Sequence, residues 1–126
     1  MKNLLRFSAL VALFLTLSAF TSNKMSVEGN WIGEFTAIDQ SIPIQVHFWR
    51  ENDELKGTIS MSDNGTKASP LSWIVVEGQN VHFEFVEECG TLVFDGTLRD
   101  GKISGNLLCS NLRGQFQLAP LSLATL

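Results

Sequence analysis

The chain has 126 residues and a formal net charge of −4 at pH 7, with 13 acidic and nine basic residues. An acidic balance argues against a nucleic-acid partner, because phosphates are bound by basic surfaces. The two cysteines, Cys89 and Cys109, are too few for a disulfide scaffold, and whether they pair is left open. These totals favour one small globular domain.

Residues 1–22 are predicted to be a secretory signal peptide. Lys2 and Arg6 precede the uncharged apolar run "SALVALFLTLSAF", which is short for a membrane span. No stop-transfer sequence follows, so we expect no stable membrane span after cleavage and a secreted or periplasmic protein. An uncleaved N-terminal anchor is the alternative. Removing the segment leaves seven basic and 13 acidic residues, a formal charge of −6.

Beyond Asn30 the hydrophobic residues recur with a period of two, which is typical of β-strands. No stretch after residue 25 has convincing helical spacing, and turn sequences such as "ENDE", "EGQN" and "RDGK" separate many of the apolar runs. The pattern predicts eight strands, at residues 30–37, 42–49, 54–61, 69–76, 81–86, 91–98, 102–109 and 112–118.

Joining each strand to the next as a hairpin places apolar or glycine residues on one common face. In this register Trp31 lies opposite Phe48, Phe48 lies opposite Leu55, and Gly96 lies opposite Gly105. A slip of one residue would move a whole strand's apolar set to the other face, so the agreement is informative. The paired glycines are expected to serve barrel curvature and packing, or else to leave room for a ligand.

Pairing the last strand with the first would remove both open edges of such a sheet. The predicted fold is therefore all-β, an eight-stranded antiparallel up-and-down barrel over residues 26–119, followed by an apolar C-terminal tail at 120–126. A two-sheet β-sandwich is the alternative.

The usual catalytic constellations do not occur in the sequence. It contains no G-x-S-x-G, C-x-x-C, H-E-x-x-H, P-loop or dinucleotide-binding motif. His47 and His82 are predicted to point outward from separate strands, so they do not predict a shared metal site. His82 is expected opposite Asp95, but no Ser or Cys faces it, so we interpret the pair as a surface contact. We predict no catalytic residue, no metal site and no cofactor.

Two groups of apolar residues are candidate binding surfaces. The large inward side chains are a hypothetical site for a small apolar ligand. They are Trp31, Phe35, Phe48, Phe83, Phe85, Phe94 and Phe116. A cluster expected on the outer face, here called the outer patch, is predicted to dock a partner or to be covered by the chain's own apolar C-terminal tail. Its residues are Leu71, Trp73, Val75, Val86, Val93 and Leu108.

Parts of the sequence resemble known families. "GNWIGEF", with Gly29 and Trp31, resembles the G-x-W start of lipocalin-like barrels, where the Trp closes one end. The wider pattern, from "WIGEF" through "GTLVFDGTLRDGKISGNL" to "GQFQL", is similar to the small β-barrel domain that precedes the catalytic domain of many secreted bacterial α/β-hydrolases. This resemblance implies a non-catalytic accessory domain. No hydrolase motif is present, so no catalytic residue is carried over.

The function expected from these observations is that of an accessory or interaction module, with a hydrolase or another protein as its partner. The alternative is a carrier that holds a small apolar ligand inside the barrel. An enzyme ranks last, because the predicted inner face has no ionisable side chain.

Overall fold

The computed structural model describes residues 26–61, 67–87 and 90–121, and in those ranges the chain forms nine β-strands and no helix. The strands are β1 (Gly29–Ala37), β2 (Gln40–Glu51), β3 (Glu54–Met61), β4 (Ser69–Pro70), β5 (Trp73–Glu77), β6 (Asn80–Glu87), β7 (Gly90–Arg99), β8 (Lys102–Cys109) and β9 (Leu112–Pro120).

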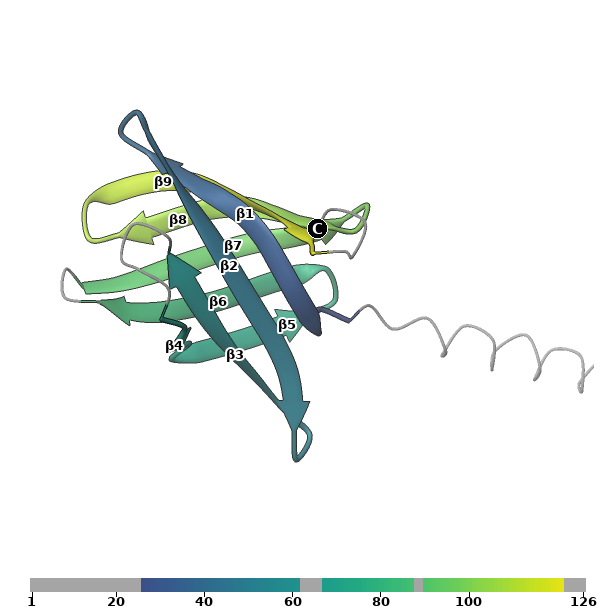
Figure 1. Cartoon of the computed structure of the whole chain (residues 1–126). Helices are drawn as coiled ribbons and strands as arrows, with labels where there is room; N and C mark the ends of the chain where they lie inside the picture. The colour runs from purple at the N-terminus through teal and green to yellow at the C-terminus, as the bar shows by residue number, and fades with distance from the viewer. Residues whose placement is uncertain (1–25, 62–66, 88–89, 122–126) are drawn as a thin grey trace, which may run out of the picture.

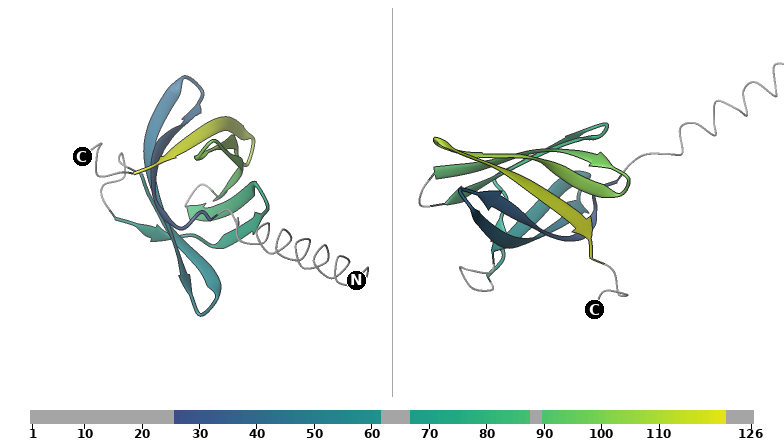
Figure 2. Two further views of the ribbon diagram at one scale, coloured as in Figure 1. Left: turned by 90° about the vertical axis from the view of Figure 1, so that its right-hand side faces the viewer. Right: turned by 90° about the horizontal axis from the view of Figure 1, so that it is seen from above.

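The strands belong to one strongly curled, barrel-like sheet with the order β4-β3-β2-β1-β9-β8-β7-β6-β5. In Figure 1 strands β1 to β3 cross in front of β5 to β9, and Figure 2 shows how the sheet bends between these two walls. The all-β prediction is confirmed. The sheet is single, unlike a sandwich, and it has nine strands because the predicted strand at 69–76 is divided into β4 and β5.

The concave side of the sheet holds the hydrophobic core. No polar or charged residue is buried in the described part of the chain. At the centre the rings of Phe83 and Phe94 stack with their centroids 4.6 Å apart, and both meet Phe116 edge to face. Phe48 and Phe35 add further edge contacts to this cluster. Aromatic pairs of this kind stabilise a core beyond the area that they bury.

The predicted register is confirmed for the hairpins from β5 to β9. Gly96 lies opposite Gly105, for example, and the turn between their strands is Asp100-Gly101. The first two hairpins were predicted wrongly by two residues, since Trp31 pairs with Val46 and Phe48 pairs with Gly57. The same side chains still face inward, because a shift of two preserves the face.

The cause of this shift is the position of the two turns. Ile38 and Asp39 form a two-residue turn with φ of 46° and 59°, and Asn52 and Asp53 form another with φ of 54° and 64°. Positive φ at both central residues is the conformation that matches the twist of a hairpin. The Ile-Asp pair lacks the glycine that usually marks such a turn, so the sequence favoured a longer loop.

The predicted pairing of the first and last strands is confirmed, with Gly33 of β1 opposite Leu118 of β9. The two backbones approach so closely that a Cβ on Gly33 would lie 1.8 Å from the carbonyl oxygen of Gln117. Gly114 meets β1 in the same way, since its Cβ would lie 2.3 Å from the carbonyl oxygen of Thr36. Glycine is needed wherever two backbones approach this closely.

The facing glycines of β7 and β8 leave no empty space. A Cβ on Gly96 would lie 2.8 Å from the Phe116 ring, and one on Gly105 would lie 1.9 Å from the carbonyl oxygen of Asp95. The ring of Phe116 therefore covers the backbone at Gly96, and the backbone of β7 lies close against Gly105. The expected role of these glycines in packing and curvature is confirmed.

The segment from β4 to β5 leaves β3 and joins β6. Ser69 lies opposite Ile59 of β3, and the N–H of Leu71 donates to the Gly57 carbonyl over 2.9 Å. The N–H of Ser72 then donates to the carbonyl of Glu84 on β6, also over 2.9 Å.

Ser72 and Trp73 therefore both oppose Glu84, which is the arrangement of a β-bulge. The predicted pairing of Gly57 with Ile74 is wrong, because the bulge carries the chain from one wall to the other.

Candidate interaction surface

The outer patch lies on β5 to β8 at one end of these strands. Trp73, Val86 and Leu108 are 58%, 61% and 44% exposed, which is high for large apolar residues of a folded sheet. Val75 and Val93 are half-buried. Clustered exposed apolar side chains indicate a contact surface more often than scattered ones do.

Leu71 does not belong to the outer patch. It is half-buried and packs against the core, with its Cδ1 over the bare backbone of Gly57. The outward direction predicted for it is wrong, because the bulge at Ser72 and Trp73 interrupts the alternation of side chains along this segment. The outer patch thus consists of five of the six predicted residues.

The strand register arranges the outer patch around one acidic residue. Trp73 of β5 lies opposite Glu84 of β6, Glu84 lies opposite Val93 of β7, and Val93 lies opposite Leu108 of β8. Side chains directly opposite on one face of an antiparallel pair have Cβ atoms about 4.5–5.5 Å apart. The patch is therefore an apolar row with a carboxylate between Trp73 and Val93.

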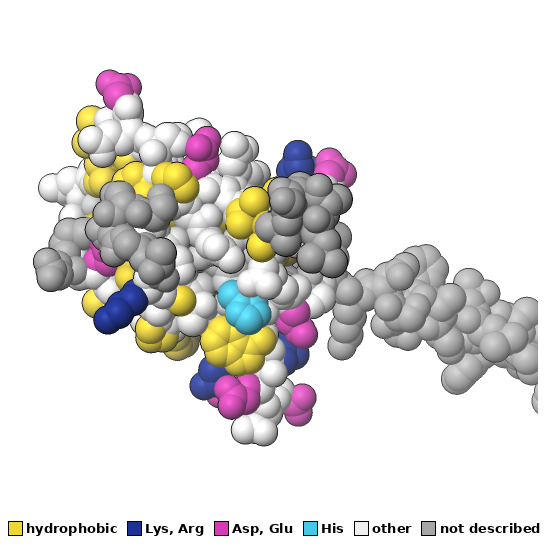
Figure 3. Space-filling model, in the orientation of Figure 1, with side chains coloured by type: hydrophobic (Ala, Val, Ile, Leu, Met, Phe, Trp, Pro, Cys, Tyr) yellow, Lys and Arg dark blue, Asp and Glu magenta, His cyan; other side chains and the backbone are white. Residues whose placement is uncertain are grey.

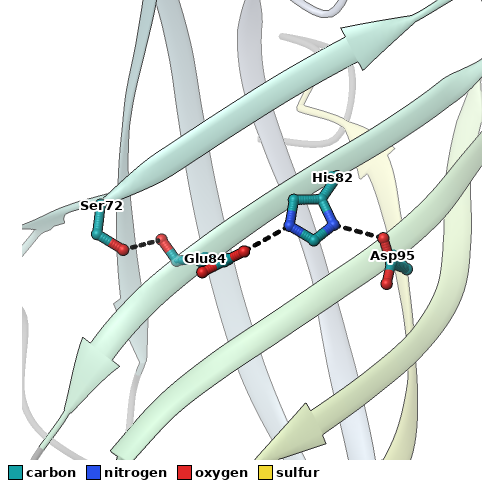
Figure 4. Close-up of polar contacts among 4 residues, drawn as sticks. All are labelled: Ser72, His82, Glu84 and Asp95. Atoms are coloured by element: carbon teal, nitrogen blue, oxygen red, sulfur yellow. Dashed lines mark hydrogen bonds and ion pairs between the residues drawn. The ribbon is translucent and has the colours of Figure 1, made fainter.

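His82 connects this carboxylate to a second one. Its Nδ1 lies 2.5 Å from Oδ1 of Asp95 on β7, and its Nε2 lies 2.6 Å from Oε2 of Glu84 on its own strand (Figure 4). The predicted contact with Asp95 is confirmed. Sequence reasoning missed Glu84, although its position two residues from His82 on the same strand puts both side chains on one face.

The two carboxylates favour the protonated form of the imidazole. The hydrogen bond with Asp95 and then the one with Glu84 raise the pKa of His82 above its ordinary value of 6.5, while partial burial opposes them. When His82 is protonated, each ring N–H donates to one carboxylate. The backbone carbonyl of Glu84 also accepts a hydrogen bond from the Ser72 hydroxyl, at 3.2 Å (Figure 4).

This cluster supplies a charged centre and no recognisable catalytic machinery. Both ring nitrogens of His82 are engaged by carboxylates, and the Ser72 hydroxyl donates to a backbone carbonyl instead of to the imidazole. A hydrolytic nucleophile would need the imidazole as its base. Within the described residues, no group of three or more His, Cys, Asp or Glu side chains is placed to hold a metal ion.

The predicted ligand-lining residues are all buried in the core, including Trp31 and Phe85. Five of the Phe rings contact one another. Trp31 donates from Nε1 to the carbonyl of Val27 over 2.8 Å, and Val27 is itself buried. The side chains that would surround a ligand are therefore packed against other side chains of the same chain.

The outside of β1 to β3 differs from the outer patch. On this face, shown in Figure 3, hydrophobic side chains lie in several small groups between polar and charged ones. On β2 the imidazole of His47 lies beside the indole of Trp49, with their ring centroids 5.1 Å apart. The outward direction predicted for His47 is confirmed, since its side chain is exposed.

Several predictions concern residues outside the described ranges. The signal peptide at 1–22 and most of the tail at 120–126 are among them, as is Cys89. Cys109 is buried on the inner face, but its pairing with Cys89 stays open. The part of the chain that is described contains no helix long and apolar enough to span a bilayer.

Comparisons with known proteins identified no relative of this chain. The chain matches no model of a known protein family, no curated protein and no solved structure. The likeness to hydrolase-associated barrel domains therefore remains an interpretation of the sequence.

Proposed function

We propose that this chain is a non-catalytic, exported interaction module that docks a partner protein through the outer patch. The observation that carries the proposal is the exposure of Trp73, 58% on a strand whose backbone is fixed by pairing with β6. Leaving a tryptophan exposed on a rigid strand brings no gain in folding, whereas tryptophan is strongly enriched among the residues that dominate protein interfaces.

The composition of the outer patch supports a partner of particular chemistry. Glu84 lies between the apolar side chains of Trp73 and Val93, with His82 beside it. Glu84 and Asp95 carry two negative charges against at most one positive charge on His82, so a partner that covers Glu84 needs a further positive charge or donor. The partner surface that fits is an apolar group next to a Lys or Arg side chain. The sequence resemblance supports a secreted hydrolase as the class of partner.

Site-specific photo-cross-linking in the producing cell tests this proposal. A photoreactive amino acid replaces Trp73 or Leu108 in the full chain, and the control position is Gln45, which is exposed on β2 in the other wall. We expect both patch positions to yield the same cross-linked protein and Gln45 to yield none. Equal cross-linking from all three positions, or none from the patch, would contradict docking through this surface.

The carrier alternative has less support, because the Phe rings that would line the ligand site contact one another. A fluorescent apolar probe added to the purified protein separates the two functions. We expect no saturable binding. Saturable binding that Phe94→Ala alters and Trp73→Ala leaves unchanged would replace the interaction module with a carrier.

A further inference from the structure

Strand β5 has one paired edge and one open edge. In the described part of the chain it pairs with β6 alone, as the last strand of the sheet. Beyond Leu71 the backbone has no further hydrogen bond to β3. In Figure 1 β5 forms the lower border of the rear wall, and β3 crosses in front of it at a steep angle.

The turn that follows β5 determines which backbone groups face the open edge. Glu77 and Asn80 flank the two-residue turn Gly78-Gln79, so they form a hydrogen-bonded pair. Because bonding alternates along an antiparallel pair, the N–H and C=O groups of Ile74 and Val76 point away from β6. Among the described residues, no backbone group pairs with these four groups.

The side chains along this edge are apolar on both faces of the sheet. Ile74 and Val76 face the core but are only partly buried, while Trp73 and Val75 face outward. No Lys or Pro lies within β5. Those residues are among the features by which proteins block pairing at a sheet edge, and β5 lacks them, although it is short and begins at the bulge of Ser72 and Trp73.

Charge indicates what kind of strand fits the edge. β5 ends in exposed Glu77 and carries no basic residue, and the whole chain has a net charge of −4. A second copy of the chain would therefore bring no cation to Glu77 and would add like charge. An apolar segment of another protein that places Lys or Arg opposite Glu77 would match both the apolar side chains of the edge and the negative charge at its end.

We propose that the open edge of β5 is a strand-addition site for an extended, apolar segment of a partner protein, paired antiparallel with a basic residue opposite Glu77. Main-chain hydrogen bonds supply affinity in this mode of recognition, and alternate side chains supply specificity. The inference deepens the proposed function, on which it rests, because it states how a partner at Trp73 would be held.

A labelled peptide with the core Lys-Ile-Val-Ile-Thr, flanked by Gly and Ser, tests the proposal by fluorescence anisotropy. Antiparallel addition places its Lys opposite Glu77 and its two Ile residues opposite Val76 and Ile74. We expect saturable binding to the purified protein. N-methylation of either Ile amide should weaken binding at least tenfold, because it removes a hydrogen bond to β5. N-methylation of the central Val amide, which faces away, should change binding less than twofold.

A protein variant supplies a second test. Val76→Pro removes an N–H that points away from β6, and proline is tolerated at such edge positions. We expect its circular dichroism spectrum to match that of the parent and its peptide binding to be lost. Should this variant fail to fold, the N-methylated peptides still decide the question.

The outcomes separate this inference from the proposed function. No peptide binding, or equal binding of all N-methylated forms, overturns strand addition, and cross-linking from Trp73 would then still support docking. A concentration-dependent dimer in sedimentation equilibrium that Val76→Pro abolishes would assign the edge to a second copy. That result would also overturn the proposal.

Discussion

The two walls of the curled sheet are connected in two places, here called the first and the second seam, and these connections are built differently. At the first, β1 and β9 pair from Trp31–Pro120 to Thr36–Gln115, and two glycines let the backbones approach. At the second, the chain passes from β3 to β6 through one short segment, with a single backbone bond from Leu71 to Gly57 beyond the β3–β4 pair. The first seam is a continuous ladder of paired residues, whereas at the second the chain only crosses from one wall to the other.

The comparison indicates where rigidity and binding capacity lie in this molecule. Backbone hydrogen bonds satisfy the first seam, so little remains there for a partner. The second seam leaves half-buried Ile74 and Val76 beside an edge with which no described strand pairs. We therefore expect substitutions at the first seam to destabilise the fold more than substitutions at the second, and substitutions along the edge of β5 to affect binding.

The largest expected effect is that of Gly33→Ala at the first seam. A Cβ would lie 1.8 Å from the carbonyl oxygen of Gln117, so the two backbones would have to separate. We expect destabilisation of about 4 kcal/mol or more, or failure to fold. Urea unfolding followed by circular dichroism measures the change in the free energy of unfolding.

Gly57→Ala at the second seam should cost less, about 1–3 kcal/mol. Its nearest new contact is the Cδ1 of Leu71, at 2.8 Å, and a side-chain end can move more easily than a backbone carbonyl. The backbone oxygen of His47, at 3.0 Å, makes some cost unavoidable. Equal destabilisation by Gly33→Ala and Gly57→Ala would remove the proposed difference between the seams.

We expect the stability of the protein to depend on pH through His82, which lies on the strand next to the open edge. Because its folded pKa is raised, the protonated imidazole contributes stability fully below the unfolded pKa of about 6.5. This contribution is lost as the pH rises through the folded pKa. It should stay below about 1 kcal/mol, because the contacts lie at the surface.

An NMR titration of His82 measures the pKa directly. Asp95→Asn should lower it more than Glu84→Gln, because the bond with Asp95 is the larger cause of the shift. The reverse order would show that the within-strand contact with Glu84 dominates.

The smallest expected effect on folding is that of Trp73→Ala. Trp73 is 58% exposed, so the free energy of unfolding should change by no more than about 0.5 kcal/mol. The matched control is Trp31→Ala at the first seam, where the indole is buried and donates to Val27. That change should cost about 3–5 kcal/mol. Similar losses for both would mean that Trp73 serves the fold.

The sequence predicted most of the fold, because strand pairing here follows chain order and the alternation of apolar residues is regular. The register of the first hairpin failed because Ile38-Asp39 lacks the usual turn signature, and only tertiary structure shows that isoleucine adopts a positive φ there. In the second hairpin the turn sequence was recognised, but not which two of its residues, Asn52 and Asp53, form the turn. The division of strand 69–76 also escaped prediction. A bulge depends on how two strands pair, and no local residue pattern predicts it.

The candidate site was predictable only in part. The contact between His82 and Asp95 followed from the hairpin register, and five residues of the outer patch followed from alternation. Leu71 was placed on the wrong face, because alternation stops at the bulge. The open edge of β5 could not be foreseen, since the predicted barrel was fully closed by pairing 69–76 with both neighbours.

The pairing of β1 with β9 also has a kinetic consequence. Every other pair of neighbouring strands is consecutive in the chain, so each can form from a short hairpin or loop. Thr36 and Gln115 are separated by about 80 residues, and closing a loop of that length costs on the order of 4 kcal/mol of chain entropy. Folding thus has many local steps and one long-range step, and the glycines Gly33 and Gly114 lie where that step takes place.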